Sequence, residues 1–177
     1  MIITISGLPG SGKTTVAKKL SKKLNYEFIS VGDLKGQFAK EKGMTIDEFM
    51  RKCSPEEVHQ KVDDYQKNIG KTKKEFIIEG WLAYHFIPNS FKIFLDVQDE
   101  VSAERVFKDQ REDEKKCDTR EEVKKMLEER LKISDEQFYK CYGIRFLKKS
   151  NYDLVIDTTK ISPNEVLEKI LYEIKNV

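Results

Sequence analysis

The sequence has few of the residues that build metal centres, disulfide frameworks or membrane spans. It holds three cysteines and two histidines among 177 residues, and Cys53, Cys117 and Cys141 lie far apart. This number and spacing exclude a zinc ribbon and a disulfide framework and favour a reducing compartment, so we expect a cytoplasmic protein. The apolar runs are no longer than a strand, which argues against a membrane helix, and the first residues do not read as an export segment.

The sequence also lacks an excess of charge of one sign. Its 33 basic residues nearly balance 31 acidic ones, which gives a net charge of +2. A total so close to neutral does not favour nucleic acid or a membrane surface as a partner. The length is sufficient for one domain with its own core, and we find no repeat or linker, so we expect residues 1–177 to form a single domain.

What the sequence does contain is a glycine-rich segment near its start. Residues 7–14, the P-loop, match the phosphate-binding pattern G-x-x-x-x-G-K-[ST] at every fixed position. They follow the apolar run 2–5 and precede a helical pattern, which is the context that the motif requires. Glycines let backbone N–H groups converge on a polyanion, and the helix start adds partial positive charge. The residues expected to hold a nucleoside triphosphate are Gly7, Leu8, Pro9, Gly10, Ser11, Gly12, Lys13, Thr14 and Thr15.

Two of these side chains have specific expected roles. Lys13 can bridge the outer phosphates, and the Thr14 hydroxyl can bind Mg²⁺. Glu79 ends an apolar strand, a position at which P-loop proteins hold Mg²⁺, often through water. Because Mg²⁺ keeps most of its waters, Thr14 and Glu79 would be enough. The alternative is that Glu79 is a strand-terminal acid facing solvent.

Short apolar runs predict the strands of a sheet. Continuous hydrophobicity suits strands covered on both faces, and helical patterns lie between the runs. This alternation predicts an α/β fold with a parallel sheet and helices on both sides, and with ligands bound beyond the C-terminal ends of the strands. The expected strands are residues 2–5, 26–29, 76–78, 91–97 and 154–156.

Two polar helical regions interrupt this pattern. Residues 33–70 contain helical patterns at 33–42, 46–52 and 55–69 with few strongly apolar positions, so we expect an inserted lobe. Within it, Asp33 either orients an acceptor or metal-bound water or caps the helix that follows it.

The second region surrounds a charged segment, residues 111–120, between a helix at 99–111 and one at about 119–140. This segment is either a solvated loop or part of a mobile cover over the phosphate site, a lid of about residues 108–132. Arg105, Arg111 and Arg130 flank it and could stabilise the charge of a transferring phosphoryl group, although each alone is more often a surface ion-pair residue.

Three further side chains leave alternatives open. Asp63 and Gln66 lie one turn apart and could hydrogen-bond the edge of a base, but a plain solvated helix face is the favoured interpretation. Trp81 either stacks on a nucleobase or packs under the lobe.

Taken together, these segments resemble the small P-loop nucleoside monophosphate kinases, and within them most closely the archaeal-type cytidylate kinases. The resemblance covers essentially the whole chain and is carried by residues 1–17, 28–34, 39–44, 79–80, 142–144 and 152–158. It implies a P-loop NTPase three-layer sandwich with a five-stranded parallel sheet in the order 2-3-1-4-5. It also implies ATP- and Mg²⁺-dependent phosphoryl transfer to a nucleoside monophosphate, most simply CMP or dCMP, by a monomer.

The resemblance further implies which residues act. The catalytic set would be Lys13, Arg105, Arg130 and Asp33. Thr14 and Glu79 would hold the metal ion. Thr159 would border the adenine of ATP.

The sequence departs from the family pattern where the acceptor's phosphate is normally held. Gly36, with Lys35 beside it, and Trp81 stand where the family usually has arginines, and Tyr65 and Gln137 stand at two further arginine positions. Lysine does not replace arginine neutrally at a bidentate phosphate site. The pattern therefore allows three alternatives. Lys35 and Arg51 could bind the acceptor's phosphate instead, the protein could be a P-loop kinase for a different small acceptor, or it could be a nucleotide-binding regulatory ATPase.

Overall fold

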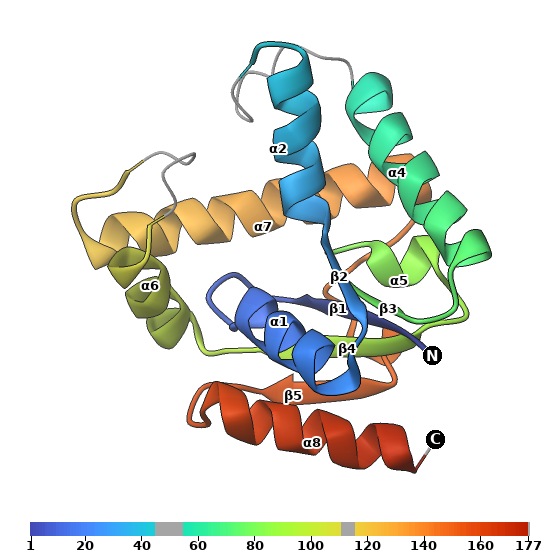
Figure 1. Cartoon of the computed structure of the whole chain (residues 1–177). Helices are drawn as coiled ribbons and strands as arrows, with labels where there is room; N and C mark the ends of the chain where they lie inside the picture. Colours follow the sequence, from blue (N-terminus) through green and yellow to red (C-terminus); the bar gives the residue numbers. More distant parts are fainter. Residues whose placement is uncertain (45–54, 111–115, 177) are drawn as a thin grey trace.

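Five parallel strands form the central sheet, and helices surround it (Figure 1). The computed structural model describes residues 1–44, 55–110 and 116–176. The strands are β1 (Ile2–Gly7), β2 (Glu27–Ser30), β3 (Phe76–Glu79), β4 (Phe91–Asp96) and β5 (Leu154–Asp157). The helices are α1 (Lys13–Leu24), α2 (Val31–Glu41), α4 (Pro55–Thr72), α5 (Ala83–Phe86), α6 (Asp99–Lys108), α7 (Arg120–Tyr142) and α8 (Pro163–Lys175), with a 3₁₀ turn at Lys149–Asn151.

The strand order is β2-β3-β1-β4-β5, as expected from the resemblance. β1 lies at the centre, where Ile3 is in register with Ile77 of β3 and Phe91 of β4. Since all neighbours are parallel, the carboxyl ends of the strands meet at one edge. Glu79 is thereby paired with Ser30 at the end of β2.

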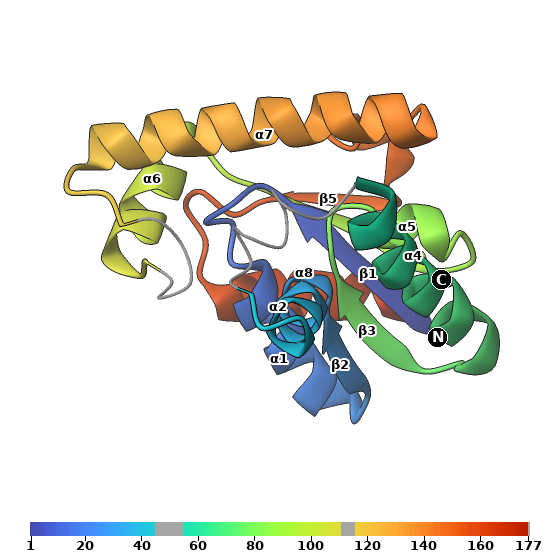
Figure 2. The same cartoon turned by 90° about the horizontal axis from the view of Figure 1, so that it is seen from above.

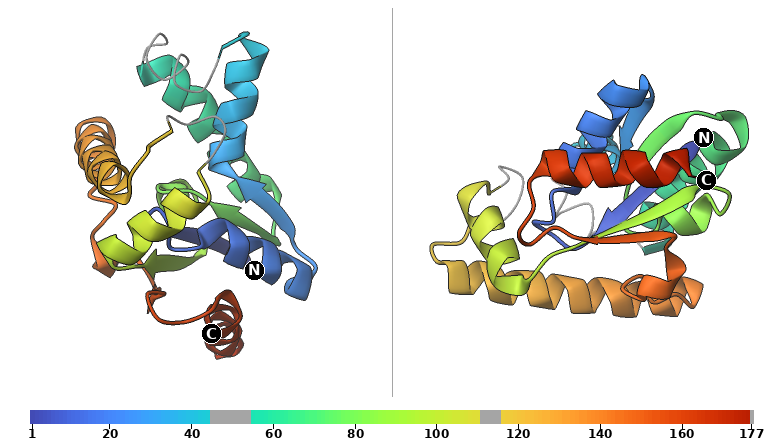
Figure 3. Two further views of the ribbon diagram at one scale, coloured as in Figure 1. Left: turned by 90° about the vertical axis from the view of Figure 1, so that its left-hand side faces the viewer. Right: turned by 90° about the horizontal axis from the view of Figure 1, so that it is seen from below.

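The central strands β1, β3 and β4 are largely buried on both faces, which explains their continuous apolar runs. On one face, Ile3 and Ile5 of β1 pack with residues of α1 and α8 such as Leu20 and Ile170. On the other, strand residues such as Phe94 pack with α5 and with Phe138 of α7. Figure 2 shows α7 and α8 on opposite sides of the sheet, and the right-hand view of Figure 3 shows α8 crossing beneath it. The expected three-layer sandwich is confirmed.

Helices α2 and α4 rise from the side of the sheet that lies away from α8, as the left-hand view of Figure 3 shows. α4 packs against α2 and α5. The start of α2 corrects one expectation, because Ser30 is the N-cap and accepts a hydrogen bond from the Asp33 backbone N–H (3.2 Å). Asp33 is therefore not the cap but lies in the first turn of the helix.

Side chains also cap two later helices, and some expectations fall outside the described residues. Ser162 and Glu165 form the capping box of α8, and Thr119 caps α7. The expected helix at 46–52, with Arg51, and the charged residues 111–115 lie outside the described residues. Within the described part of the chain, no helix is both long enough and apolar enough to cross a membrane.

Candidate active site

The P-loop follows a close approach of β1 to β4 that only glycine permits. Gly7 has a φ of +145°, and a Cβ there would lie 2.1 Å from the Leu95 carbonyl oxygen. Gly10 has a φ of +67°, and its Cβ would lie 2.8 Å from the Ser102 carbonyl oxygen. Side chains at these positions would meet backbone atoms, so the loop conformation requires both glycines.

Side chains of α6 hold the loop in place. Ser102 donates from Oγ to the Pro9 carbonyl (2.8 Å), a contact that the sequence did not suggest. Arg105 donates from Nη1 to the Gly10 carbonyl (3.2 Å) and from Nη2 to the Thr158 carbonyl (2.9 Å). The Arg105 guanidinium thus ties the P-loop to the segment after β5.

Lys13 begins α1 at the centre of the loop. Its Nζ donates a hydrogen bond to the Leu8 carbonyl (2.7 Å). Burial lowers the pKa of Lys13 to about 8, with a smaller lowering by the charge of Arg130 and an opposing effect of Glu79. A partly desolvated ammonium of this kind is strongly favoured to pair with a phosphate.

Thr14 and Glu79 lie together, as expected for a magnesium site. The Thr14 hydroxyl donates to Glu79 Oε1 (3.0 Å). The other carboxylate oxygen, Oε2, is buried and accepts no hydrogen bond from any residue that the structure describes. The described residues contain no group of three or more His, Cys, Asp or Glu side chains that could hold a metal ion. A hydroxyl and one carboxylate suit Mg²⁺, which keeps several of its waters.

One cavity of about 590 Å³ extends from the P-loop to α4. Of the expected site residues, the structure brings to it the set Pro9, Gly10, Ser11, Gly12, Lys13, Thr14, Thr15, Glu79, Arg105 and Arg130. Among the described residues, the expected ones that do not line it are Gly7, Leu8, Asp33 and Thr159. The role of Asp33, which is exposed, stays a prediction.

Two basic side chains besides Lys13 and Arg105 line the cavity. Lys35 of α2 and Arg130 of α7 both line it. The pKa of Lys35 is lowered by burial and by the charge of Arg130, and Asp63 opposes this. The charge of Arg130 acts on Lys13 as well. Positive charge therefore continues from the P-loop towards α4.

Trp81 is packed into the wall of this cavity. Its indole N–H donates to the Gly7 carbonyl (3.1 Å), and its ring stacks on Phe146 with centroids 5.0 Å apart. The Arg130 guanidinium lies 5.6 Å from the ring centroid, within cation–π range. Trp81 is therefore packed, but its ring contacts within the described ranges are with Phe146 and with Phe138 of α7 and not with the lobe, and the residue also lines the cavity.

Asp63 and Gln66 form the α4 end of the cavity. They are only 7% and 2% exposed, so the favoured interpretation of a solvated helix face was wrong. The Tyr142 hydroxyl at the end of α7 donates to Asp63 Oδ2 (2.5 Å). Burial raises the pKa of the Asp63 carboxyl. The approach of α7, which buries this face, could not be read from the local sequence of α4.

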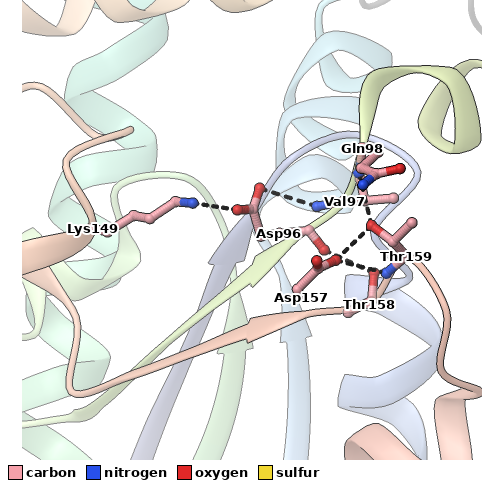
Figure 4. Close-up of polar contacts among 7 residues, drawn as sticks. All are labelled: Asp96, Val97, Gln98, Lys149, Asp157, Thr158 and Thr159. Carbon is pink, nitrogen blue, oxygen red and sulfur yellow. Dashed lines mark hydrogen bonds and ion pairs between the residues drawn. The ribbon is translucent and has the colours of Figure 1, made fainter.

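Hydrogen bonds fix the turn after β5 to the end of β4 (Figure 4). Asp157 Oδ1 accepts from the Thr159 backbone N–H (2.9 Å) and hydroxyl (2.5 Å), which lower the pKa of this carboxyl. The Gln98 backbone N–H donates to Thr159 Oγ1 (3.0 Å), and Lys149 pairs with Asp96. The Thr159 side chain thus stabilises this turn and its contact with β4, whereas its neighbour Thr158 lines the cavity.

Sequence relatives cover nearly the whole chain. It is 34% identical over 181 residues to a cytidylate kinase of Archaeoglobus fulgidus, covering 100% of this chain and 97% of that protein. It is 36% identical over 168 residues to a cytidylate kinase of Pyrococcus furiosus, covering 94% of this chain and 84% of that protein. It is also 37% identical over 171 residues to an S-adenosylmethionine-dependent nucleotide dehydratase of Lacinutrix mariniflava, covering 96% of this chain but only 35% of that protein.

Solved structures support the same fold. A shikimate kinase from Acinetobacter baumannii matches with a TM-score of 0.66 at 20% identity, over 99% of this chain and 93% of that one. A protein of Eubacterium ventriosum, described as uncharacterized, matches with a TM-score of 0.76 at 19% identity, over 100% of this chain and 99% of that one. At these identities the likeness concerns the fold alone. The sequence pattern of the cytidylate kinase-like family matches residues 2–160, and the chain therefore belongs to that family.

Proposed function

We propose that this protein transfers the γ-phosphoryl group of ATP to a nucleoside monophosphate, most simply CMP or dCMP. The observation that carries the proposal is that one continuous cavity has the P-loop at one end and the buried polar residues of α4 at the other. Its volume of about 590 Å³ is within the range of small-molecule sites. A donor and an acceptor could therefore lie end to end in it.

The donor half uses the P-loop. Its backbone N–H groups and Lys13 would bind the triphosphate, and Thr158 would border the adenine. Thr14 and Glu79 would hold Mg²⁺, since Glu79 has a buried oxygen that accepts no hydrogen bond within the described part of the chain. When bound there, Mg²⁺ would offset the negative charge of the phosphates.

The transfer needs no covalent intermediate on the protein. An oxygen of the acceptor's phosphate attacks the γ-phosphorus, the bond from that phosphorus to the β–γ bridging oxygen breaks, and CDP and ADP form. Lys13 and Arg130 face the cavity and would stabilise charge on the transferring group. Arg105 would act by positioning, since its guanidinium N–H groups bind backbone carbonyls of the P-loop and of Thr158.

Lys35 would hold the acceptor's phosphate in place of the arginines usual in the family. It lies in the cavity with Arg130 and is desolvated. We expect Lys35→Ala to raise the acceptor's KM by about tenfold or more, the effect of losing about 1.4 kcal/mol, with little change in the KM of ATP. Lys40→Ala is the matched control, because Lys40 is exposed on the same helix. If Lys35→Ala left the acceptor's KM unchanged, the acceptor's phosphate would have to be bound by other residues.

The helices around the cavity suggest how water is excluded. Helices α2, α4 and α6 all contribute residues to its lining. We propose that the lobe (about 33–70) and the lid (about 108–132) close over the substrates and limit wasteful hydrolysis. Rapid ATP hydrolysis with no acceptor present would contradict this gating.

The function itself is tested by a coupled ADP-release assay with ATP, Mg²⁺ and a panel of nucleoside monophosphates. We expect CMP or dCMP to give the highest kcat/KM. The same assay with shikimate and other small hydroxylated acceptors tests the main alternative. If no nucleoside monophosphate accelerates ADP release while such an acceptor does, the proposal is wrong.

A further inference from the structure

We propose that Asp63 and Gln66 are specificity-determining residues, which select an acceptor base with an exocyclic amine and so favour cytosine over uracil. This inference rests on the proposed function, because it assigns the base end of the same cavity. It goes further by naming the side chains that recognise the base and the group that they recognise.

Gln66 presents an acceptor that the protein does not use. The residue is 2% exposed and lines the cavity. Its Nε2 donates within α4 to the Val62 carbonyl (3.3 Å), whereas its Oε1 is buried without a hydrogen-bond partner among the described residues. Leaving a buried amide oxygen unpaired costs about 1–3 kcal/mol, so a donor supplied by a ligand would recover that cost.

Asp63 presents a second acceptor one turn earlier on the same helix. The hydrogen bond from the Tyr142 hydroxyl to Oδ2 fixes the carboxylate from α7. Burial raises the pKa of this carboxyl, and the Tyr142 hydrogen bond and the charges of Lys67 and Lys35 oppose that rise. A carboxylate held in this way accepts hydrogen bonds, and it faces the same cavity as Gln66.

Two neighbouring hydrogen-bond acceptors can bind an amine, which donates, but they repel a carbonyl oxygen, which cannot donate. The 4-amino group of cytosine offers two N–H donors, whereas uracil has a carbonyl oxygen at that position. An amine could donate to Asp63 and to Gln66 Oε1 at once. A carbonyl there would face two oxygens and leave both without a donor, which is the arrangement that discriminates most strongly between analogues.

The position of the pair along the cavity fits a base rather than a phosphate. The charge of Arg130 acts on both Lys13 and Lys35, and Lys35 in turn is close enough to Asp63 for the charge of each to act on the other. This order runs from the P-loop to α4. The acceptor's phosphate would thus meet the cations, and its base would reach Asp63. Apolar residues of the cavity, including Val62, Leu82 and Phe86, would cover the faces of the ring.

The test compares Asp63→Asn with Asp64→Asn. Asp64 is the next residue of α4, its side chain is 63% exposed, and it carries the same chemical change without facing the cavity. With saturating ATP and Mg²⁺, kcat/KM is measured for CMP, UMP and dCMP. We expect Asp63→Asn to lower the ratio of kcat/KM for CMP over UMP by about tenfold or more, because an asparagine amide can donate to the uracil carbonyl. Asp64→Asn should leave this ratio unchanged.

A second variant and a binding measurement keep the inference testable if Asp63→Asn folds poorly. Gln66→Met keeps the size of the side chain and removes its acceptor, so it should weaken CMP and spare UMP. Trp81 is the only tryptophan and lines the cavity, so its fluorescence can report CMP and UMP affinity without turnover.

The outcomes separate this inference from the proposed function. Equal losses for CMP and UMP in both variants would overturn base recognition. A changed ratio of CMP to dCMP with an unchanged ratio of CMP to UMP would assign Asp63 to the sugar and would also overturn it. If the unmodified protein phosphorylates no nucleoside monophosphate, the proposed function fails first and the inference fails with it.

Discussion

Replacing Lys13 by methionine should stabilise the protein in the absence of nucleotide and abolish its stabilisation by ATP. Burial lowers the pKa of Lys13 from 10.5 to about 8. At ~1.4 kcal/mol per pKa unit, carrying this charge costs the folded state about 3 kcal/mol at pH 7. Methionine is similar in length and has no charge, so it removes this cost.

The hydrogen bond of Lys13 reduces the expected gain. Its Nζ donates to the Leu8 carbonyl, and loss of that bond costs about 1 kcal/mol. The carbonyl keeps a second donor, the Ser11 backbone N–H (3.2 Å). The net gain is then about 2 kcal/mol, and for a chain of this length it should raise Tm by about 4–8 °C.

The pH dependence distinguishes this mechanism from a general packing effect. Above pH 10.5 lysine is neutral in both the folded and the unfolded state, so the cost is absent. As the pH falls from 10.5 towards 8 the unfolded chain binds the proton more readily than the folded one, and the cost grows. It is fully present below about pH 8. The advantage of Lys13→Met should therefore be largest at pH 7 and shrink between pH 8 and pH 10.

The assay is urea unfolding at pH 7 and at pH 10, with thermal melting alongside it. Lys22→Met is the matched control, since Lys22 is exposed on the same helix. Adding ATP with Mg²⁺ at 100 times Kd should stabilise the unmodified protein by about 2.7 kcal/mol and Lys13→Met by much less, so the order of the two Tm values reverses. A Lys13→Met variant that is less stable at pH 7, or equally more stable at both pH values, would refute the reasoning.

Three further predictions concern the metal, the loop and the fold. Glu79→Gln should leave Tm nearly unchanged but raise the Mg²⁺ concentration needed for half-maximal rate by about tenfold, measured by Mg²⁺ titration of the coupled assay; an unchanged requirement would remove Glu79 from the site. Arg105→Lys should raise the KM of ATP more than that of the acceptor, because lysine cannot bond Gly10 and Thr158 together; steady-state kinetics with each substrate varied would contradict this if both constants rose equally. Ser30→Ala should lower the free energy of unfolding by about 1 kcal/mol through loss of the α2 cap, and urea curves identical to those of the unmodified protein would contradict the cap.

The P-loop end of the cavity was predictable because its information is local. The P-loop pattern lies between one strand and one helix, and Glu79 follows an apolar run directly, so spacing alone predicted their meeting. The fold was predictable for a similar reason, since five short apolar strands alternate with helices and the resemblance supplies their order.

The α4 end of the cavity was less predictable because its contacts join distant parts of the chain. Asp63 is buried and accepts a hydrogen bond from the hydroxyl of Tyr142, 79 residues further along the chain. Nothing in the sequence of α4 indicates that contact. Arg105 was expected to act on phosphates, but it binds backbone carbonyls 95 and 53 residues away. At the start of α2, Ser30 and Asp33 are both residue types that commonly cap helices. Because β2 ends at Ser30 and the helix begins directly after it, Ser30 is the cap.

The continuity of the cavity has a consequence for inhibitor chemistry. A single molecule that joins adenosine to cytidine through a polyphosphate chain could occupy the P-loop end and the α4 end together. Its second half would bind at the high effective concentration set by the linker, so it should bind far more tightly than either nucleotide alone. Shortening the chain until the two ends could no longer be spanned would remove that gain abruptly, and the shortest effective linker would measure the separation of the two subsites.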